Sequence, residues 1–383
     1  MNLKTENLAE IRRDFHRFPE LGFKEKRTKE KIASYLKELG LDVHSGVGIV
    51  GVLHGGEGSK IIGFRADMDA LPIHETNTHN YISKNTGIMH ACGHDGHMTT
   101  LLGAAHKLST NTNFNGTIVF IFQPNEEHGL GAKAMMDEGL LENFPMQEIY
   151  GMHNLPGVPT GELLTRSGII CSSESLFEIK IKGMGGHSSM PQLGRDAITI
   201  GAEVVQALQT IISRRIASGS GAVVSVTEFI SNGQRNVLPG ETILKGDVRT
   251  RRPDDRKKIE LFLHQITSGI ASAHDIEIEV SFETEFIETN NHIKPTEAVL
   301  KTAKKSGLKV TNCKPMSFSE DFAHFSNAVP GCFFLLGNGI DGANNKPLHS
   351  SDYDFNDDLL SIGADFWANL AKNRLSTKGS NSV

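Results

Sequence analysis

The sequence of 383 residues is poor in cysteine and contains no long apolar run. The four cysteines, Cys92, Cys171, Cys313 and Cys332, are too few and too widely spaced to indicate a disulfide framework. No segment is long and apolar enough to predict a transmembrane helix. The N-terminal residues 1–18 alternate charged and apolar side chains, and they lack the basic and apolar regions of a signal peptide. We therefore expect a cytoplasmic protein with no membrane partner.

An excess of basic charge is also absent, because 39 Lys and Arg residues face 45 Asp and Glu residues for a net charge of -6. This balance lacks the electrostatic footprint of a nucleic-acid-binding protein, so nucleic acid is not expected as a partner. The hydrophobic content of 38% and charged content of 22% are ordinary for a globular protein. A chain of this length exceeds what one hydrophobic core usually supports, which predicts two domains.

Hydrophobic periodicity predicts an α/β fold for most of the chain, with helices alternating with short strands. Strands that alternate with helices favour a mixed, largely parallel sheet flanked by helices. The predicted helices are residues 8–18, 26–39, 98–108, 296–306 and 359–375, and the predicted strands are 49–53, 60–66, 116–122 and 331–337.

The pattern changes near residue 175, where strands with one polar face begin. Residues 177–182 and 276–283 alternate apolar and charged side chains, and they enclose two helical stretches and two further strands. The resulting order, β-α-β-β-α-β, is that of a ferredoxin-like domain. We expect residues 175–291 to form an inserted domain, and residues 1–174 and 292–383 to form one discontinuous domain.

The strongest chemical signal is the segment of residues 89–97, Met-His-Ala-Cys-Gly-His-Asp-Gly-His. Cys92 and His94 are two positions apart, so in an extended segment both side chains would leave the same face and could bind one ion. A thiolate and an imidazole suit zinc and similar ions better than magnesium or calcium. The alternative is a helix-capping turn in which Asp95 is the cap and the histidines are exposed.

Other candidate residues carry less information when each is taken alone. Glu126 and Glu127 follow a predicted strand, where one carboxylate could bind a metal while its neighbour transfers protons. A solvated acidic turn explains the same pair. His153 and His349 lie at similar junctions, and each by itself is more typical of a structural histidine.

Together these motifs resemble a known enzyme family. They are Arg65-Ala-Asp-Met-Asp-Ala-Leu-Pro72, the segment 90–97, Phe122-Gln-Pro-Asn-Glu-Glu127, His153, Gly185-Gly-His-Ser-Ser-Met-Pro191, Ser319-Glu-Asp-Phe322 and Leu348-His-Ser350. In this order they are similar to the co-catalytic metallopeptidases that include aminoacylases and carboxypeptidases. The amidohydrolase branch, with hippurate hydrolase and indole-acetyl-amino-acid hydrolases, is the nearest in pattern.

The resemblance implies two divalent metal ions per subunit, zinc or manganese first and cobalt or nickel as alternatives. The implied ligands are Cys92, His94, Glu127, His153 and His349. Glu126 would be the general base, and Asp67 a carboxylate that orients a ligand histidine.

The resemblance also implies that the inserted domain is a lid and makes a homodimer. His187 would stabilise the oxyanion, often in the partner subunit's active site, and Asn236 and Arg249 would bind the substrate carboxylate. Arg235 and His128 depart from the family pattern near the expected substrate pocket, so the acyl-group preference of relatives does not transfer.

The predicted function is therefore hydrolysis of the amide bond of N-acyl amino acids by a metal-activated water. A dipeptidase or aminopeptidase acting on short peptides is the alternative within the enzyme class, because the same metal pair can cleave peptide bonds. A metal-binding protein without catalysis is the alternative outside that class.

Overall fold

The computed structural model describes residues 7–376, which form two compact units. The first unit comprises the residues up to Ile170, Thr289–Lys314 and the chain from Asp321 onward, and the second comprises Cys171–Glu288 and Pro315–Glu320. All four cysteines are free and buried. Across the described residues, no helix has the length and apolar character needed to cross a bilayer.

The first unit is built on an eight-stranded sheet in the order β1-β2-β4-β3-β5-β16-β6-β15. The neighbouring strands β4, β3, β5 and β16 run parallel at its centre, whereas β1, β2 and β6 join antiparallel neighbours. The mixed, largely parallel sheet predicted from the sequence is confirmed. Its strands are β1 (Asp42–Ser45), β2 (Ile49–Gly55), β3 (Ile61–Asp67), β4 (Gly116–Gln123), β5 (Glu148–Pro156), β6 (Leu163–Thr165), β15 (Val310–Asn312) and β16 (Gly331–Gly339).

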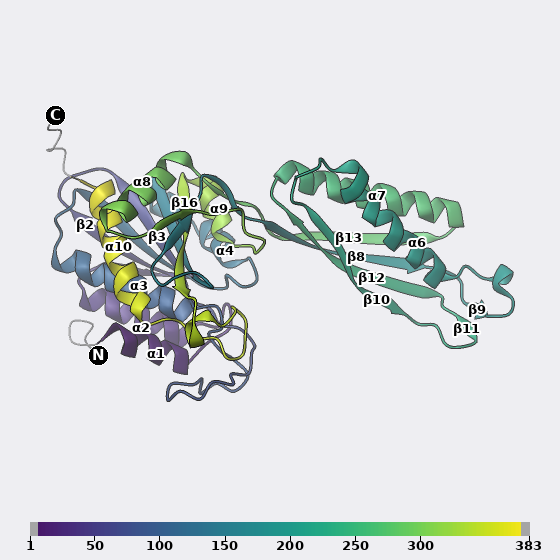
Figure 1. Ribbon diagram of the computed structural model, residues 1–383, viewed down its shortest axis with the longest axis horizontal. Helices are drawn as coiled ribbons and strands as arrows, with labels where there is room; N and C mark the ends of the chain where they lie inside the picture. Colours follow the sequence, from purple (N-terminus) through teal and green to yellow (C-terminus); the bar gives the residue numbers. More distant parts are fainter. Residues whose placement is uncertain (1–6, 377–383) are drawn as a thin grey trace. The chain divides into compact units, whose positions relative to one another are not determined.

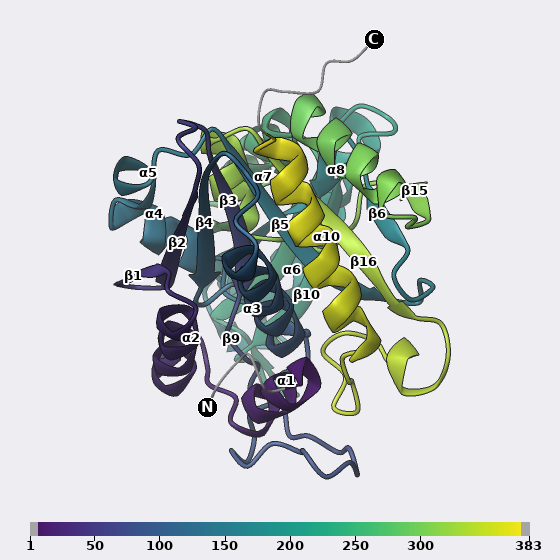
Figure 2. The same cartoon turned by 90° about the vertical axis from the view of Figure 1, so that its left-hand side faces the viewer.

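Helices cover both faces of this sheet. The long helices α3 and α10 pack side by side on one face (Figure 2), while α4 and α9 contact strands β4, β5 and β16. The helices of this unit are α1 (Leu8–Arg17), α2 (Lys26–Glu38), α3 (His94–Thr110), α4 (Gly131–Asp137), α5 (Leu140–Asn143), α8 (Ile293–Lys305), α9 (Phe322–Ala328) and α10 (Asp358–Arg374). Short β7 (Gly168–Cys171) and β14 (Thr289–Asn291) pair separately, and a 3-10 turn spans Gly342–Asn345.

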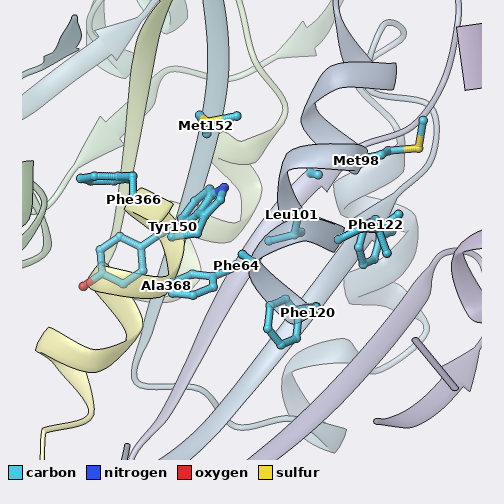
Figure 3. Close-up of a cluster of buried hydrophobic side chains, with 14 of the residues drawn as sticks. Phe64, Met98, Leu101, Phe120, Phe122, Tyr150, Met152, Phe366 and Ala368 are labelled. Carbon is cyan, nitrogen blue, oxygen red and sulfur yellow. The ribbon is translucent and has the colours of Figure 1, made fainter. Parts of the chain in front are cut away.

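Aromatic and aliphatic side chains fill the space between the sheet and its helices (Figure 3). Phe64 on β3 lies 4.6 Å from the Trp367 ring on α10, measured between ring centroids, and 6.2 Å from Phe120 on β4. Met98 and Leu101 on α3 are fully buried in the same cluster. This two-sided burial fixes the positions of the strand ends, and the site described below lies at those ends.

The second unit has a separate antiparallel sheet in the order β10-β12-β8-β13. Two helices, α6 and α7, lie on one face of it (Figure 1). In chain order the elements are β8 (Ser173–Lys182), α6 (Ala197–Thr210), β10 (Val223–Ser231), β12 (Glu241–Thr250), α7 (Pro253–His274) and β13 (Glu277–Phe286). A π-helical turn over Ile211–Arg215 extends α6, a 3-10 turn spans Pro191–Leu193, and β9 (Gly186–His187) pairs with β11 (Val237–Leu238).

Candidate metal centre

Seven of the residues predicted from the sequence meet in the first unit. Asp67 ends β3, Glu126 and Glu127 follow β4, and His153 lies in the last half of β5. These strands are parallel, so their carboxyl ends share one edge of the sheet, which is where ligands bind in α/β folds. The group is completed by Cys92 just before α3, by His94 at the first position of α3, and by His349 from the chain after β16.

The arrangement of Cys92 and His94 differs from the extended segment predicted from the sequence, and that prediction was wrong. Helix α3 begins at His94, and Gly93 before it has a left-handed backbone with φ of 93°. A side chain at Gly93 would lie within 2.4 Å of the Asn154 amide oxygen and 2.6 Å of the Tyr353 hydroxyl. Glycine is therefore required at this position, and the tight turn brings the two ligand candidates together instead.

The two buried histidines of the group present one particular nitrogen to it. His94 donates from Nδ1 to the backbone carbonyl of Asp69 at 2.8 Å, and His153 donates from Nδ1 to the carbonyl of Asn154 at 2.7 Å. In each ring Nε2 is then the atom available for a metal, which is the usual arrangement of a metal-binding histidine. His153 Nε2 lies 3.3 Å from the Cys92 sulfur.

A strained turn after β4 holds the two glutamates. Asn125 has a positive φ of 49°, and its backbone N–H donates to the Glu25 carboxylate at 3.0 Å. The next two backbone N–H groups, those of Glu126 and Glu127, donate to the two carboxylate oxygens of Asp69 at 3.0 and 3.1 Å. Asp69 thus fixes both the glutamate turn and His94, a role that the sequence analysis did not assign.

The unpaired polar atoms of the group fit a metal ion. His94 Nε2 and Glu127 Oε1 are buried without a hydrogen-bond partner and lie 3.9 Å apart. That separation is too long for a hydrogen bond, but one ion bound at about 2.0–2.2 Å from each atom would span it. The other Glu127 oxygen lies 3.3 Å from His349 Nε2. Glu127 therefore faces two different histidines, as a ligand of a dinuclear site would.

The electrostatics of the group favour a bound cation. Burial, followed by the charges of Glu127 and Glu126, raises the pKa of the Cys92 thiol well above its ordinary value. Burial also raises the pKa of Glu127 to about 7. Burial lowers the pKa of His94, but the nearby Asp67 and Asp69 have the larger combined effect and raise it to about 10. Without a cation, the group therefore favours a neutral thiol and a protonated imidazole. A divalent ion would replace these protons and stabilise the thiolate.

Asp67 belongs to a buried network beside the ligand candidates. Its two carboxylate oxygens bond His97 Nδ1 at 2.7 Å and the Arg65 guanidinium at 2.8 Å, and Oδ2 lies 3.8 Å from His94 Nε2. Arg65 also donates to Gln123 at 2.7 Å and to Asp321 at 2.8 Å. The network explains the Arg65-Ala-Asp67 motif and Asp321. His97 is the hydrogen-bonded partner of Asp67, and the sequence analysis gave this histidine no role.

The remaining predicted residues, His187, Asn236 and Arg249, lie in the second unit. His187 pairs with Val237 in the β9–β11 ladder, and Ser188 donates to the Asn236 carbonyl at 3.1 Å, so His187 and Asn236 are neighbours. Arg249 lies near the other end of β12, where it pairs with Asp247 at 3.0 Å, with Glu174 and with Ser319. Arg249 is thus already engaged by two carboxylates within its own unit.

Comparison with known proteins confirms the predicted resemblance. The model of peptidase family M20/M25/M40 matches residues 63–373. The chain is 39% identical over 369 residues to hippurate hydrolase of Campylobacter jejuni, with 94% of each chain covered. It is also 34% identical over 387 residues to thermostable carboxypeptidase 1 of Saccharolobus solfataricus, covering 98% of this chain and 95% of that one.

A solved structure gives the same result for the fold. A dinuclear metal-binding peptidase of the M20 family from Bacillus subtilis superposes with a TM-score of 0.84 at 30% sequence identity, covering 97% of this chain and 98% of that chain. The agreement extends over nearly the full length of both proteins.

Proposed function

The chain belongs to peptidase family M20/M25/M40 and is a metal-dependent amide hydrolase, and on that premise we propose that it cleaves the amide bond of N-acyl amino acids. The observation that carries this proposal is the pair of glutamates on one turn, of which Glu127 faces two histidines. Glu126 then remains to transfer protons, with one oxygen 3.9 Å from His94 Nε2. The similarity to hippurate hydrolase supports an acyl-amino-acid substrate.

The donor atoms of this group fit two divalent ions, held by Cys92, His94, Glu127, His153 and His349. When bound, the ions lower the pKa of a water molecule and polarise the carbonyl of the amide. The thiolate and imidazole donors favour zinc and the carboxylate of Glu127 suits manganese, with cobalt or nickel as substitutes.

Glu126 acts as the general base and then as the general acid. It accepts a proton from the attacking water and delivers it to the leaving nitrogen, so the amide bond breaks with no net change in the protonation of Glu126. Asp69 holds the backbone of this glutamate, and burial of the side chain keeps bulk water from competing for the proton.

For the second unit we propose the role of a ferredoxin-like lid and dimerisation domain, corresponding to residues 175–291. Its chain order and antiparallel sheet support this assignment. Strand β10 is at one edge of the sheet and exposes Val223, Phe229 and Ile230 by 44–48% of their surface. An exposed apolar edge strand is a template for pairing with a second copy, so β10 is our proposed homodimer contact.

Within this domain, His187 would stabilise the oxyanion of the partner subunit's active site, and Asn236 and Arg249 would bind the substrate carboxylate. The proximity of His187 and Asn236 supports a joint role. Arg249 would have to exchange Asp247 or Glu174 for the substrate carboxylate.

Mixing two inactive variants tests the role of His187. In a heterodimer of His187→Ala and Glu126→Gln subunits, one site retains Glu126 and receives His187 from the partner. If His187 acts between subunits, mixing restores about a quarter of wild-type activity, since about half the dimers are mixed and each has one complete site. No recovery in a mixture shown by mass spectrometry to contain heterodimers would contradict the assignment.

A substrate panel tests the main proposal. The protein, purified without added metal and then loaded with zinc or manganese, is assayed on N-benzoyl and N-acetyl amino acids and on unblocked dipeptides. Preferred cleavage of the blocked substrates supports the proposal. Preferred cleavage of dipeptides favours a peptidase, in line with the similarity to a carboxypeptidase. Metal binding without any cleavage would indicate a non-catalytic metal-binding protein.

A further inference from the structure

A second group of metal-ligating side chains lies apart from the candidate centre, and none of its members has a role in the proposed reaction. His16 on α1 and Glu75 and His79 in the segment between β3 and α3 bring three ligand atoms within 4.8 Å of one another. Two imidazoles and one carboxylate form a typical ligand set for zinc. We propose that these three residues bind a further zinc ion that holds the segment 68–93 to helix α1.

Two of the three separations between the ligand atoms match the edges of a zinc tetrahedron. Bonds of about 2.0–2.1 Å at tetrahedral angles place neighbouring ligand atoms about 3.3 Å apart. Glu75 Oε1 lies 3.1 Å from His16 Nε2 and 3.3 Å from His79 Nε2. All three ligand atoms lie within 4.8 Å of one another, so the two imidazoles would close on the ion when it binds.

His79 provides an independent observation. Both of its ring nitrogens are buried and neither makes a hydrogen bond of good geometry, although Nε2 lies 3.3 Å from Glu75 and 19% of the side chain is exposed. A buried imidazole normally bonds at least one nitrogen to a neighbour. The ring is instead held by stacking on Tyr81, with 3.7 Å between centroids, which leaves Nε2 directed at Glu75. A metal ion would supply the missing partner.

The neighbours of the group orient its ligands as they do in established metal sites. His16 Nδ1 bonds the Asp95 carboxylate at 2.8 Å, which fixes the ring and leaves Nε2 for the ion. Ser83 donates its backbone N–H to the second Glu75 oxygen at 2.7 Å, and Asn77 donates its amide to Oε1 at 3.0 Å. The ion would replace the proton that His16 Nε2 otherwise shares with Glu75. A water molecule would occupy the fourth position, reached from the exposed side of His79.

The position of the site indicates that a bound ion would order the segment 68–93. Residues 68–93 contain neither a helix nor a strand, yet they lead directly into Cys92 and His94. A long irregular segment loses much conformational entropy when it folds. A metal ion that cross-links residues distant in sequence restricts the unfolded chain and so reduces that loss. The bond between His16 and Asp95 extends the tie to the first turn of α3.

Zinc binding by three proteins tests the proposal: wild type, His79→Ala, and the control His54→Ala, which removes an exposed histidine of β2 that contacts Thr117. Each is dialysed against zinc buffered at submicromolar free concentration and analysed by mass spectrometry for metal. We expect His79→Ala to hold about one zinc ion per chain fewer than wild type and His54→Ala to match wild type. Equal zinc content in wild type and His79→Ala would overturn the proposal.

Proteolysis provides a readout that does not depend on activity. Lys84 is exposed within the tied segment, so trypsin should cut after it more slowly when zinc is present. We expect zinc to protect Lys84 in wild type and in His54→Ala, but not in His79→Ala or in Glu75→Gln, which keeps the shape of the carboxylate. If zinc protected Lys84 from trypsin equally in all four proteins, the proposal that zinc holds this segment to α1 would be wrong.

Discussion

The two sheets of the molecule differ in where their charged side chains lie. In the first unit every residue of β16 is buried, and charged groups such as Arg65 and Asp67 lie inside, bonded to one another. In the second unit β13 alternates exposed and half-buried residues, and its sheet carries exposed ion pairs such as Lys245 with Glu178 at 3.5 Å. Buried charge is costly unless it is paired, so the buried charges of the first unit support placing the proposed chemistry there.

The largest effect should come from the carboxylate assigned to proton transfer. Glu126→Gln keeps the size of the side chain but removes its ability to accept a proton, so turnover should fall by about two to four orders of magnitude. Metal content, measured by mass spectrometry, should stay at the wild-type level. The matched control is Glu178→Gln on β8, an exposed carboxylate of the second unit that should leave turnover unchanged. Activity of Glu126→Gln within threefold of wild type would refute the assignment.

Breaking the buried network should reduce stability strongly. Arg65→Met leaves Asp67 and Asp321 buried without their cation, which should lower the free energy of unfolding by about 3–5 kcal/mol. Urea denaturation of the metal-loaded protein measures this change. If the free energy of unfolding falls by less than about 1 kcal/mol, the buried carboxylates of the first unit do not depend on Arg65 for their stability.

A pH-dependent effect should distinguish one buried carboxylate from exposed ones. Burial raises the pKa of Glu25 to about 7 in the folded protein, above its ordinary value near 4.5. The folded state therefore holds this proton more tightly than the unfolded state, and stability is lost as the pH rises through about 5 to 7. Glu25→Gln removes this dependence, so it should gain about 1–2 kcal/mol relative to wild type between pH 5 and pH 8.

Urea denaturation at several pH values checks this prediction, with Glu30→Gln on the exposed side of α2 as the control. The control should show the same pH dependence as wild type. A constant difference between Glu25→Gln and wild type across this range would show that Glu25 is ionised in the folded protein throughout.

The smallest effect is expected at the surface of the second unit. Lys245→Met removes an exposed ion pair with Glu178, and such pairs contribute about 0–1 kcal/mol because water and salt screen them. Urea denaturation should find the variant within that range of wild type, and added salt should reduce the difference further. If Lys245→Met lowered the free energy of unfolding as much as Arg65→Met, the exposed ion pair would stabilise the protein as strongly as the buried network.

Periodicity predicted elements whose residues alternate or recur on one face. The helix expected at residues 26–39 is α2 at Lys26–Glu38. A continuous apolar run, not a period, predicted the strand at 331–337, which is β16 at Gly331–Gly339. Strand β5, which carries His153, was missed. Like β16 it is buried and has no period, but its run of Ile, Tyr, Gly and Met before His153 is shorter than the apolar run of β16 and contains a glycine.

The geometry of the site was less predictable than its composition. The sequence singled out Cys92 and His94, but it could not show that a left-handed Gly93 and the start of α3 set their positions. Arg65 and Asp321 are 256 positions apart, so their bond depends on the completed tertiary fold. His97 and Asp69 were overlooked for the same reason, since their partners come from other elements.

The chain leaves the first unit after Ile170 and returns at Thr289, and β16 then inserts between β5 and β6. During synthesis on the ribosome, Cys92, His94, Glu127 and His153 emerge before the whole of the second unit, and His349 emerges after it. A nascent chain therefore carries four candidate ligands beside a sheet that still lacks one of its central strands. A centre built from all five candidate ligands can therefore be completed only after nearly the entire protein has been translated.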